Sequence, residues 1–147
     1  MNSALCAKVA TAVVLVLSPY EPLPGQGAET PPPAKSPRAG EEVTLPAGSI
    51  VARAYLALPE APGPHPGILI SPEWWGHNDF VRMRADMLAT LGYAALAMDL
   101  YGNGKKAHDP QTAARLDGAL KGNQKEMNAR VLAHLKFLVG RPEVDGD

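Results

Sequence analysis

The sequence predicts an α/β fold, in which a mostly parallel sheet is flanked by helices. Two runs, Gly67–Ser71 and Tyr93–Leu100, are apolar on both faces, as central parallel strands are. Segments with helical spacing lie between these runs and after them, and each begins at a residue that can cap a helix. Strands separated by helical segments favour parallel pairing. From Glu41 onward, the predicted order is therefore β-β-β-α-β-α-α.

The first two predicted strands form a hairpin. Glu41–Leu45 and Ile50–Leu58 are rich in residues with high β propensity, and Pro46–Ser49 between them is typical of a turn. This arrangement predicts an antiparallel pair at the start of the sheet. A loop with four prolines, Pro59–Pro66, then leads into the run Gly67–Ser71.

The first predicted helix lies between the two apolar runs. Asn78 can cap it, because its side chain can accept a hydrogen bond from the exposed first-turn N–H groups. Gly92 suits the position that follows the last turn. The helical spacing predicts an apolar face, which in a globular domain turns to the core. Its members are Phe80, Met83, Met87, Leu88 and Leu91.

Two more helices are predicted after the second apolar run. Asp109 followed by Pro110 places a cap before a proline at the first helical position, and this helix runs to about Lys121. The next helix covers about 123–139 and ends at Gly140. Its predicted apolar face contains Met127, Val131, Leu132, Leu135 and Leu138.

Composition excludes several classes of function. The chain has 147 residues, of which 46% are hydrophobic and 20% charged, with a net charge of -1. Such a chain fits one globular domain and lacks the basic face that nucleic acid binding needs. Its single cysteine, Cys6, excludes an intrachain disulfide framework and a multi-cysteine zinc site.

The histidines give no sign of a metal site. None has metal-ligand spacing with a second histidine or a cysteine, so neither a metal nor a cofactor is expected. They are His65, His77, His108 and His134. A structural role is favoured for each. His134 is placed at the flank of the apolar face of the long helix, and His77 is the best functional candidate because of its position.

The first 40 residues differ from the rest. Lys8 precedes the nine-residue apolar run Val9–Leu17, which predicts an export signal over residues 1–28. The run is less than half of the roughly 20 apolar residues that a membrane span needs, so no stable span is expected. Residues 29–40 include Pro31–Pro33 and predict an extended linker. We therefore expect an exported protein, periplasmic or secreted, with its domain in residues 41–147.

The stretch most informative about function is Pro72–Asp79. Both tryptophans of the chain, Trp74 and Trp75, lie there beside Glu73, between a strand end and a helix start. Backbone N–H groups at a helix start lack intrahelical acceptors and can bind a developing anion. Composition alone leaves two interpretations open. Either the tryptophans cover the core and Glu73 is a solvated loop residue, or the stretch forms a site.

A second candidate stretch, Met98–Lys106, follows the second apolar run. Asp99 can either orient a site residue or accept hydrogen bonds from N–H groups of the local turn, and the second role is favoured. Gly102–Gly104 lacks the spacing of a dinucleotide-binding or phosphate-binding loop. Nucleotide binding is therefore not expected.

Three segments taken together resemble the dienelactone hydrolase family. They are Pro66–Asp79, Arg84–Tyr93 and Met98–Gly102. In the second segment, the residues that carry the resemblance are Arg84-Ala85-Asp86-Met87-Leu88 and Leu91-Gly92-Tyr93. The most specific part is the E-W-W-G segment followed at this distance by D-L-Y-G. The resemblance covers Glu41–Asp147 and implies the N-terminal half of an α/β-hydrolase fold.

The resemblance implies an enzyme that cleaves small-molecule esters or lactones through an acyl-enzyme, like a carboxymethylenebutenolidase. The backbone N–H of Trp74 would form part of the oxyanion hole, and Glu73 would contact the resting nucleophile. The family's best-known members carry a substrate-binding arginine after the D-L-Y segment, where this chain has Gly102–Gly104. The resemblance therefore names no substrate, and it sets no oligomeric state.

The resemblance also implies that the catalytic triad is incomplete. The family's nucleophile lies in a G-x-C-x-G or G-x-S-x-G turn, and the sequence contains neither. Cys6 lies in the predicted signal, and Ser71 ends a different strand. Arg141–Asp147 resembles the turn into the strand that delivers the nucleophile. We therefore expect nucleophile, acid and histidine to be absent, and these 147 residues alone to be poorly soluble or partly unfolded and inactive on p-nitrophenyl esters.

Two functions remain open at this point. The chain is either the N-terminal half of an exported ester or lactone hydrolase, or a degenerate half-domain that binds a partner or exchanges strands with another chain. The coding sequence directly after Asp147 distinguishes them. Continuation into an apolar strand and a G-x-[CS]-x-G turn would support the enzyme, and a stop codon with a stable product would support the binding module.

Overall fold

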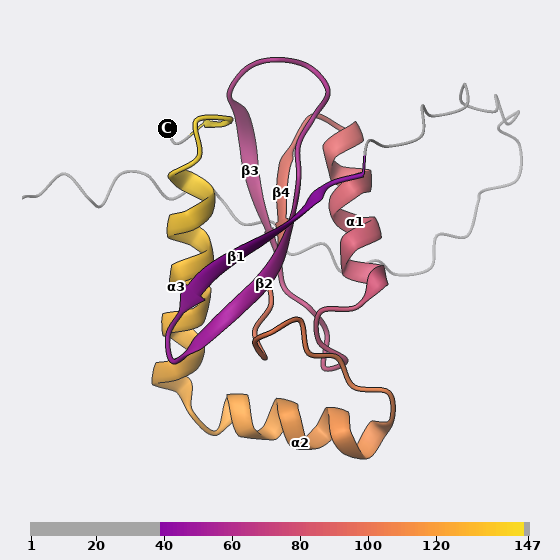
Figure 1. The fold of residues 1–147 in the computed structure, drawn as a ribbon, viewed down its shortest axis with the longest axis vertical. Coiled ribbons are helices and arrows are strands. Elements are labelled where there is room, and N and C mark those ends of the chain that lie inside the picture. Colours follow the sequence, from indigo (N-terminus) through magenta and orange to yellow (C-terminus); the bar gives the residue numbers. More distant parts are fainter. Residues whose placement is uncertain (1–38, 146–147) are drawn as a thin grey trace, which may run out of the picture.

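A computed structural model describes residues 39–145 of the chain, so the predicted signal and most of the predicted linker lie outside the described residues. Figure 1 shows the arrangement of the elements. In chain order they are β1 (Glu41–Ala47), β2 (Ile50–Ala57), β3 (His65–Ile70), α1 (Asp79–Thr90), β4 (Ala94–Ala97), α2 (Pro110–Lys121), α3 (Gln124–Val139) and β5 (Val144–Asp145). The predicted order is confirmed, with one short strand added at the end.

The five strands form one mixed sheet in the order β1-β2-β4-β3-β5. β1 and β2 form the predicted antiparallel hairpin, and β2 pairs antiparallel with β4. β3 is parallel to β4, as the two apolar runs predict, and its other edge pairs with β5 at His65 and Pro66 only. The predicted α/β class is therefore confirmed. Among residues 39–145, no helix is both long and apolar enough to cross a bilayer.

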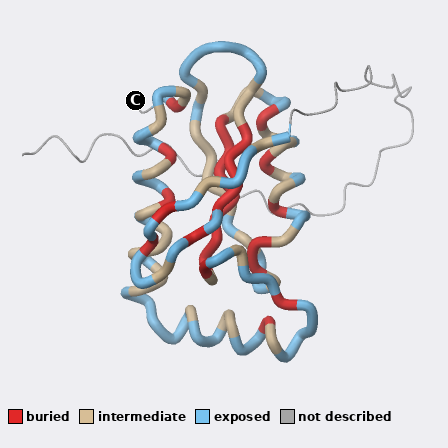
Figure 2. Tube along the Cα trace, viewed as in Figure 1, coloured by how far each residue is buried: buried red, intermediate tan, exposed pale blue. Residues whose placement is uncertain are grey.

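Helices cover both faces of the sheet, and the strands alternate between them. In β4, Ala94 and Leu96 pack in the core on the α3 side, whereas Ala95 and Ala97 pack in the core on the α1 side. This alternation follows from the two-residue period of a strand. Figure 2 shows the buried residues concentrated on the central strands. α2 crosses the end of the sheet at which β3 and β4 finish (Figure 1).

Several strand boundaries differ from the prediction. β3 runs from His65 to Ile70, so it begins inside the predicted loop Pro59–Pro66 and ends before Ser71, and β2 ends at Ala57 and not at Leu58. The hairpin turn is shorter than Pro46–Ser49, because β1 continues to Ala47 and only Gly48 and Ser49 connect the strands. Gly48 has a φ of 60°, which suits glycine at the first position of a two-residue turn. β4 ends at Ala97 and not at Leu100, because the chain turns away there into the following loop.

The predicted apolar face of α1 is wrong except at Leu88, which packs against the core. The residues that face the sheet are Val81, Ala85 and Ala89, with Leu88 partly buried beside them. The larger apolar residues lie on the exposed side, with relative exposures of 45% for Phe80, 51% for Met83, 40% for Met87 and 66% for Leu91. Small side chains let the helix approach an alanine-rich strand closely, so residue size and not apolarity alone sets the face.

The predicted apolar face of α3 is also wrong in part. Leu138 is buried as predicted, whereas Leu132 and Leu135 are exposed. His134 is fully buried, whereas the sequence predicts it at the flank of the apolar face. The polar His134 lies inside because both of its ring nitrogens form hydrogen bonds there, as described below.

Candidate active site

The two candidate stretches lie side by side at the carboxyl ends of β3 and β4. Tyr101 donates its hydroxyl hydrogen bond to the Trp74 carbonyl oxygen over 3.0 Å. The N–H of Ala107 donates to the Trp75 carbonyl over 2.9 Å. In an open α/β sheet, ligands bind outside the carboxyl ends of the strands, which is where these loops meet.

The two loops are in close contact at Gly76. It forms an isolated bridge with Lys106, and its φ of 82° lies in the left-handed region. A Cβ atom at this position would lie 2.5 Å from the Lys105 carbonyl oxygen and 2.8 Å from the Tyr101 ring. Glycine is therefore required both for the backbone conformation and for the close approach.

Asp99 holds the loop after β4 together from inside. Its carboxylate is fully buried and accepts four backbone N–H hydrogen bonds. They come from Arg53 at 2.9 Å, Tyr101 at 3.2 Å, Gly102 at 2.8 Å and Gly104 at 2.7 Å. The role favoured from the sequence, hydrogen bonding to turn N–H groups, is confirmed. Asp99 also ties this loop to β2 through Arg53, which the sequence did not indicate.

His134 fixes the start of the same loop. Its Nε2 accepts a hydrogen bond from the Asp99 N–H over 3.3 Å, and its Nδ1 lies 2.8 Å from the Arg130 carbonyl oxygen. These partners require the neutral tautomer with the proton on Nδ1. Burial lowers the pKa of His134, which keeps the ring neutral.

His77 is the other buried histidine of the site region. Its relative exposure is 2%, and its Nδ1 lies 3.3 Å from the Met98 carbonyl oxygen, which it bonds as a donor. Among the described residues, its Nε2 has no partner. Burial lowers the pKa of His77. It connects the loop before α1 to the end of β4.

Glu73 and Trp74 contrast with these buried groups because they are exposed. Trp74 has a relative exposure of 41%, and its ring centroid lies 5.1 Å from that of Trp75. No described residue accepts a hydrogen bond from the Trp74 N–H, or pairs with the Glu73 carboxylate. Asn78 caps α1 next to them as predicted, accepting from the Val81 N–H over 3.2 Å. The loop after β3 thus contains an N–H donor and a carboxylate that have no described partner.

The described residues hold no assembled triad. Ser71 lies in this region, but its hydroxyl contacts only the carbonyl oxygen of Pro72. The same part of the chain contains no group of three histidine, cysteine, aspartate or glutamate side chains that could hold a metal ion.

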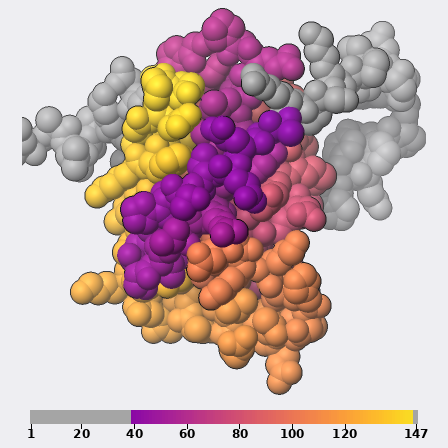
Figure 3. All heavy atoms as spheres, viewed as in Figure 1, coloured from indigo at the N-terminus to yellow at the C-terminus, as the bar shows by residue number. Residues whose placement is uncertain are grey.

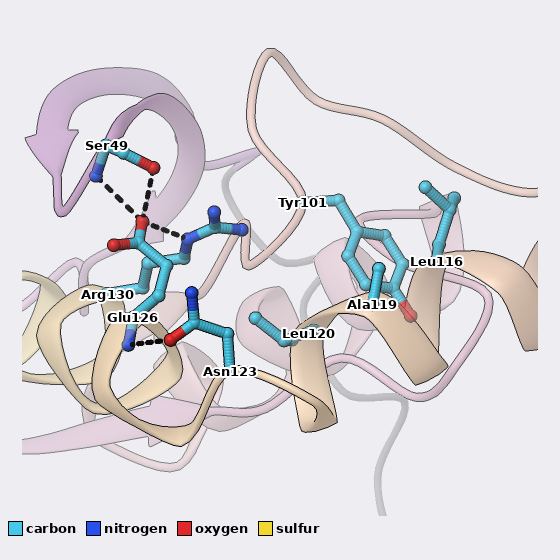
Figure 4. A pocket seen from close by; sticks show the side chains of 8 residues that line it. All are labelled: Ser49, Tyr101, Leu116, Ala119, Leu120, Asn123, Glu126 and Arg130. Atoms are coloured by element: carbon cyan, nitrogen blue, oxygen red, sulfur yellow. Dashed lines mark hydrogen bonds and ion pairs between the residues drawn. The ribbon is translucent and has the colours of Figure 1, made fainter.

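A pocket of about 220 Å³ lies at the same end of the molecule, between the hairpin, α2 and α3. Figure 3 shows α2 and the loop after β4 closing this end beneath the hairpin. Figure 4 shows Ser49, Glu126 and Arg130 on one side of the pocket and Tyr101, Leu116 and Ala119 on the other. Sequence reasoning missed this pocket. The i,i+4 spacing of Glu126 and Arg130 could have indicated their ion pair, but no pattern indicates that Ser49 joins it.

Comparison with known proteins decides the family. The model of the dienelactone hydrolase family matches residues 52–147. The chain belongs to the dienelactone hydrolase family. The match contains both candidate loops, including Glu73, Trp74 and Asp99, whereas Ser49 of the pocket lies before it.

Two solved structures resemble the chain closely. One, called m3DLH, is 38% identical with a TM-score of 0.70 and covers 74% of the chain. The other is the dienelactone hydrolase-like promiscuous phosphotriesterase P91 from metagenomic libraries, 32% identical with a TM-score of 0.68 over 73% of the chain. The matched part is 45% of each of those chains, so the chain spans less than half of their length.

A relative in Methylorubrum extorquens, named "Putative carboxymethylenebutenolidase", is 42% identical over 60 residues. That segment is 41% of the chain and 21% of the relative. The likeness therefore supports the family and leaves the activity of the whole protein to be argued from the site.

Proposed function

We propose that the chain supplies half of the active site of a carboxylic ester or lactone hydrolase. The supporting observation is that Glu73 and Trp74 are exposed residues of the loop after β3, and that the Glu73 carboxylate and the Trp74 N–H have no described partner. A free N–H beside a helix N-terminus suits the negative oxygen of a tetrahedral intermediate. Glu73 then contacts the resting nucleophile.

The nucleophile, acid and histidine of this mechanism come from outside residues 39–145. The described histidines cannot serve, because His77 and His134 are buried, and His65 and His108 form no hydrogen bond to any described serine hydroxyl. We therefore expect the 147-residue chain alone to leave p-nitrophenyl acetate unhydrolysed. Turnover by the purified chain at a rate above that of a heat-treated sample would contradict this expectation.

A chimera tests the role of Trp74. Residues 1–147 are joined to the remaining part of m3DLH, the structure with 38% identity, and hydrolysis of p-nitrophenyl esters is measured. Trp74→Pro removes the N–H, and Trp74→Phe removes the indole but keeps the N–H. Loss of one oxyanion donor costs about 10²–10³ in kcat, so Trp74→Pro is expected to be at least a hundredfold slower than Trp74→Phe. Equal rates for the two variants would refute the role.

We also propose that the protein is exported, on the strength of the apolar run Val9–Leu17 after Lys8. This segment lies outside the described residues. Expression of the chain in a bacterium, followed by N-terminal sequencing of the periplasmic fraction, tests the proposal. A product that keeps Met1 and stays in the cytosolic fraction would contradict it.

The second candidate function, a non-catalytic half-domain, is favoured by one observation. Over Gly67–Ile70, the edge of β3 that faces away from β4 has no strand partner among the described residues. An unpaired apolar edge can pair with another chain. If the chain works in this way, light scattering will show a stable dimer at micromolar concentration, and Ile68→Pro will abolish it.

A further inference from the structure

Two buried nitrogen atoms near the start of α1 have no hydrogen-bond partner among the described residues. They are the Nε2 of His77 and the Nε of Arg82. Most buried polar atoms in folded proteins do have a partner, so two such atoms in one region need an explanation. The proposed ester chemistry uses neither of them.

The two atoms have complementary hydrogen-bonding roles. The Nδ1 of His77 donates to the Met98 carbonyl oxygen over 3.3 Å, so the neutral ring carries its proton there and Nε2 is an acceptor. The Nε of Arg82 carries a hydrogen and can only donate. A single group that donates to the first atom and accepts from the second would therefore satisfy both.

The start of α1 brings the two side chains together. Asn78 is the N-cap, so His77 stands one residue before the cap and Arg82 is the fourth residue of the helix. Side chains at these two positions often pack against each other, and when both are apolar they form the hydrophobic staple. Burial lowers the pKa of His77, and the positive charge of Arg82 lowers it further, so the guanidinium is within electrostatic reach of the ring.

Arg82 is itself held by the sheet. Its Nη2 pairs with the Glu42 carboxylate in β1, and its guanidinium carbon lies 5.6 Å from the centre of the Tyr55 ring in β2. The Tyr55 hydroxyl donates to Asp86 of α1 over 2.9 Å. A group that joins His77 to Arg82 therefore connects the loop after β3 to β1, β2 and α1.

We propose that one buried water molecule joins the Nε2 of His77 to the Nε of Arg82, and that His77 thereby positions the Trp74 N–H. The water donates to Nε2 and accepts from the Nε–H, and two polar partners are enough to hold a buried water. Trp74 stands three residues before His77 in the same loop, so an anchor on His77 limits how far the Trp74 N–H can move. The positioning role rests on the proposed function, whereas the water bridge does not.

A double-mutant cycle measured by urea denaturation tests the bridge. His77→Leu removes the acceptor, and Arg82→Lys replaces Nε by a methylene group while it keeps a cation for Glu42. With His77 present, Arg82→Lys leaves the water with one partner, and the folding equilibrium constant should fall at least threefold. In the His77→Leu background the Nε–H is already unpaired, so its removal should leave the constant unchanged or raise it. The same fall in both backgrounds would overturn the bridge.

Arg84→Lys is the matched control for this cycle. Arg84 belongs to the same helix, and its guanidinium lies over the Phe80 ring. The control should change the equilibrium constant by the same factor in both backgrounds. The cycle is measured in the 147-residue chain, or in the chimera with m3DLH if the chain alone does not unfold in one transition. Both proteins contain every residue of the bridge.

NMR of the His77 ring detects the water directly. The ring nitrogen signals should show a proton on Nδ1 and none on Nε2, and the proton on Cε1 should show a cross-peak with a bound water. This cross-peak should lose at least half of its intensity in Arg82→Lys and keep its intensity in Arg84→Lys. A proton on Nε2, or a ring without a water cross-peak, would overturn the proposal.

Kinetics of the chimera test the positioning role. His77→Leu should lower kcat for p-nitrophenyl acetate at least tenfold and change KM less than twofold, because an oxyanion donor acts mainly in the transition state. His77→Gln keeps an amide N–H for the Met98 carbonyl and an amide oxygen for the water, so its kcat should return to within threefold of the parent chimera. An unchanged kcat in His77→Leu, or equal losses in both variants, would refute the positioning role.

The bridge and the proposed function can fail separately. A chimera that hydrolyses no ester, with the cycle and the ring signals as expected, would refute the proposed function and leave the bridge in place. An additive cycle in an active chimera would refute the bridge and leave the role of Trp74 to the comparison of Trp74→Pro with Trp74→Phe.

Discussion

The two loops at the carboxyl edge use their polar groups in opposite ways. In the loop after β4, the buried Asp99 carboxylate receives four N–H hydrogen bonds and leaves little for a ligand. In the loop after β3, the Glu73 carboxylate and the Trp74 N–H have no described partner. The first loop acts as a scaffold, and the second presents the two groups on which the proposed function depends. This division is common in enzymes, where rigid elements hold a few exposed groups in position.

The scaffold role of Asp99 predicts the largest effect. Asp99→Ala leaves four N–H groups without their acceptor in a buried site, so the free energy of unfolding should fall by about 4 kcal/mol. Asp109→Ala is the matched control, because Asp109 is an exposed carboxylate that accepts the Thr112 N–H at the start of α2. Loss of such a cap costs about 1 kcal/mol. Urea denaturation measures both, and similar losses would show that Asp99 is no more than a local cap.

A side chain at the contact between the loops should have the next largest effect. Gly76→Ala combines a left-handed φ with a Cβ 2.5 Å from a backbone oxygen, and a loss of about 3 kcal/mol is expected. Gly92 has a φ of 94°, and a Cβ added there would meet nothing within 4 Å, so Gly92→Ala carries backbone strain alone, about 1 kcal/mol. If urea denaturation shows equal losses of unfolding free energy for Gly76→Ala and Gly92→Ala, the two loops separate freely.

Acid should weaken the scaffold before it affects the exposed loop. Burial lowers the folded-state pKa of both His77 and His134 below the ordinary value of 6.5. The unfolded chain therefore binds these protons more readily, and stability is lost as pH falls below about 6.5. For each of these histidines, the free energy of unfolding falls by at most about 1.4 kcal/mol per pH unit below about pH 6.5. Urea midpoints at pH 7.5 and pH 5.5 measure the loss.

Substitutions of three histidines test the assignment of this acid sensitivity. His134→Gln should reduce the difference between the two pH values, whereas His108→Gln, at an exposed position, should leave it unchanged. A pH difference that survives in His134→Gln and His77→Gln together would assign the acid sensitivity to other groups. Glu126 changes the stability only at lower pH. Its pKa is about 2 in the folded chain, against an ordinary value of 4.5, so the stability that its ionised carboxylate adds is lost as the pH falls from about 4.5 to about 2.

Much of this architecture could be predicted from the sequence, and the reasons for the failures are physical. The caps Asn78 and Asp109 were predictable because a cap acts on its own helix, within three residues. The buried face of α1 was not, because it depends on the alanines of the strand beneath, which let Ala85 and Ala89 in and keep Met83 out. Periodicity identifies a helix, but only the neighbouring surface decides which side it buries.

The candidate site divides in the same way. Asp99 was recognisable as a turn carboxylate, but its hydrogen bond to Arg53 joins positions 46 residues apart, and no local pattern contains it. The pocket was missed for the same reason, because Ser49 and Glu126 lie 77 residues apart. Resemblance to a family indicates Trp74 and Glu73 as candidates, which periodicity alone does not, and their roles stay a prediction.

The smallest effect on stability is expected at Glu73. Its exposed carboxylate has no described partner, so Glu73→Gln should change the free energy of unfolding by less than about 0.5 kcal/mol. Glu42→Gln is the control for an exposed glutamate, because Glu42 lies in β1 and its carboxylate already pairs with Arg82. In the chimera, Glu73→Gln should lower kcat while Glu42→Gln should not, since only Glu73 stands beside the Trp74 N–H. A Glu73→Gln chimera with unchanged kcat and unchanged stability would make Glu73 a solvated loop residue, and the contrast between the two loops would then rest on Trp74 alone.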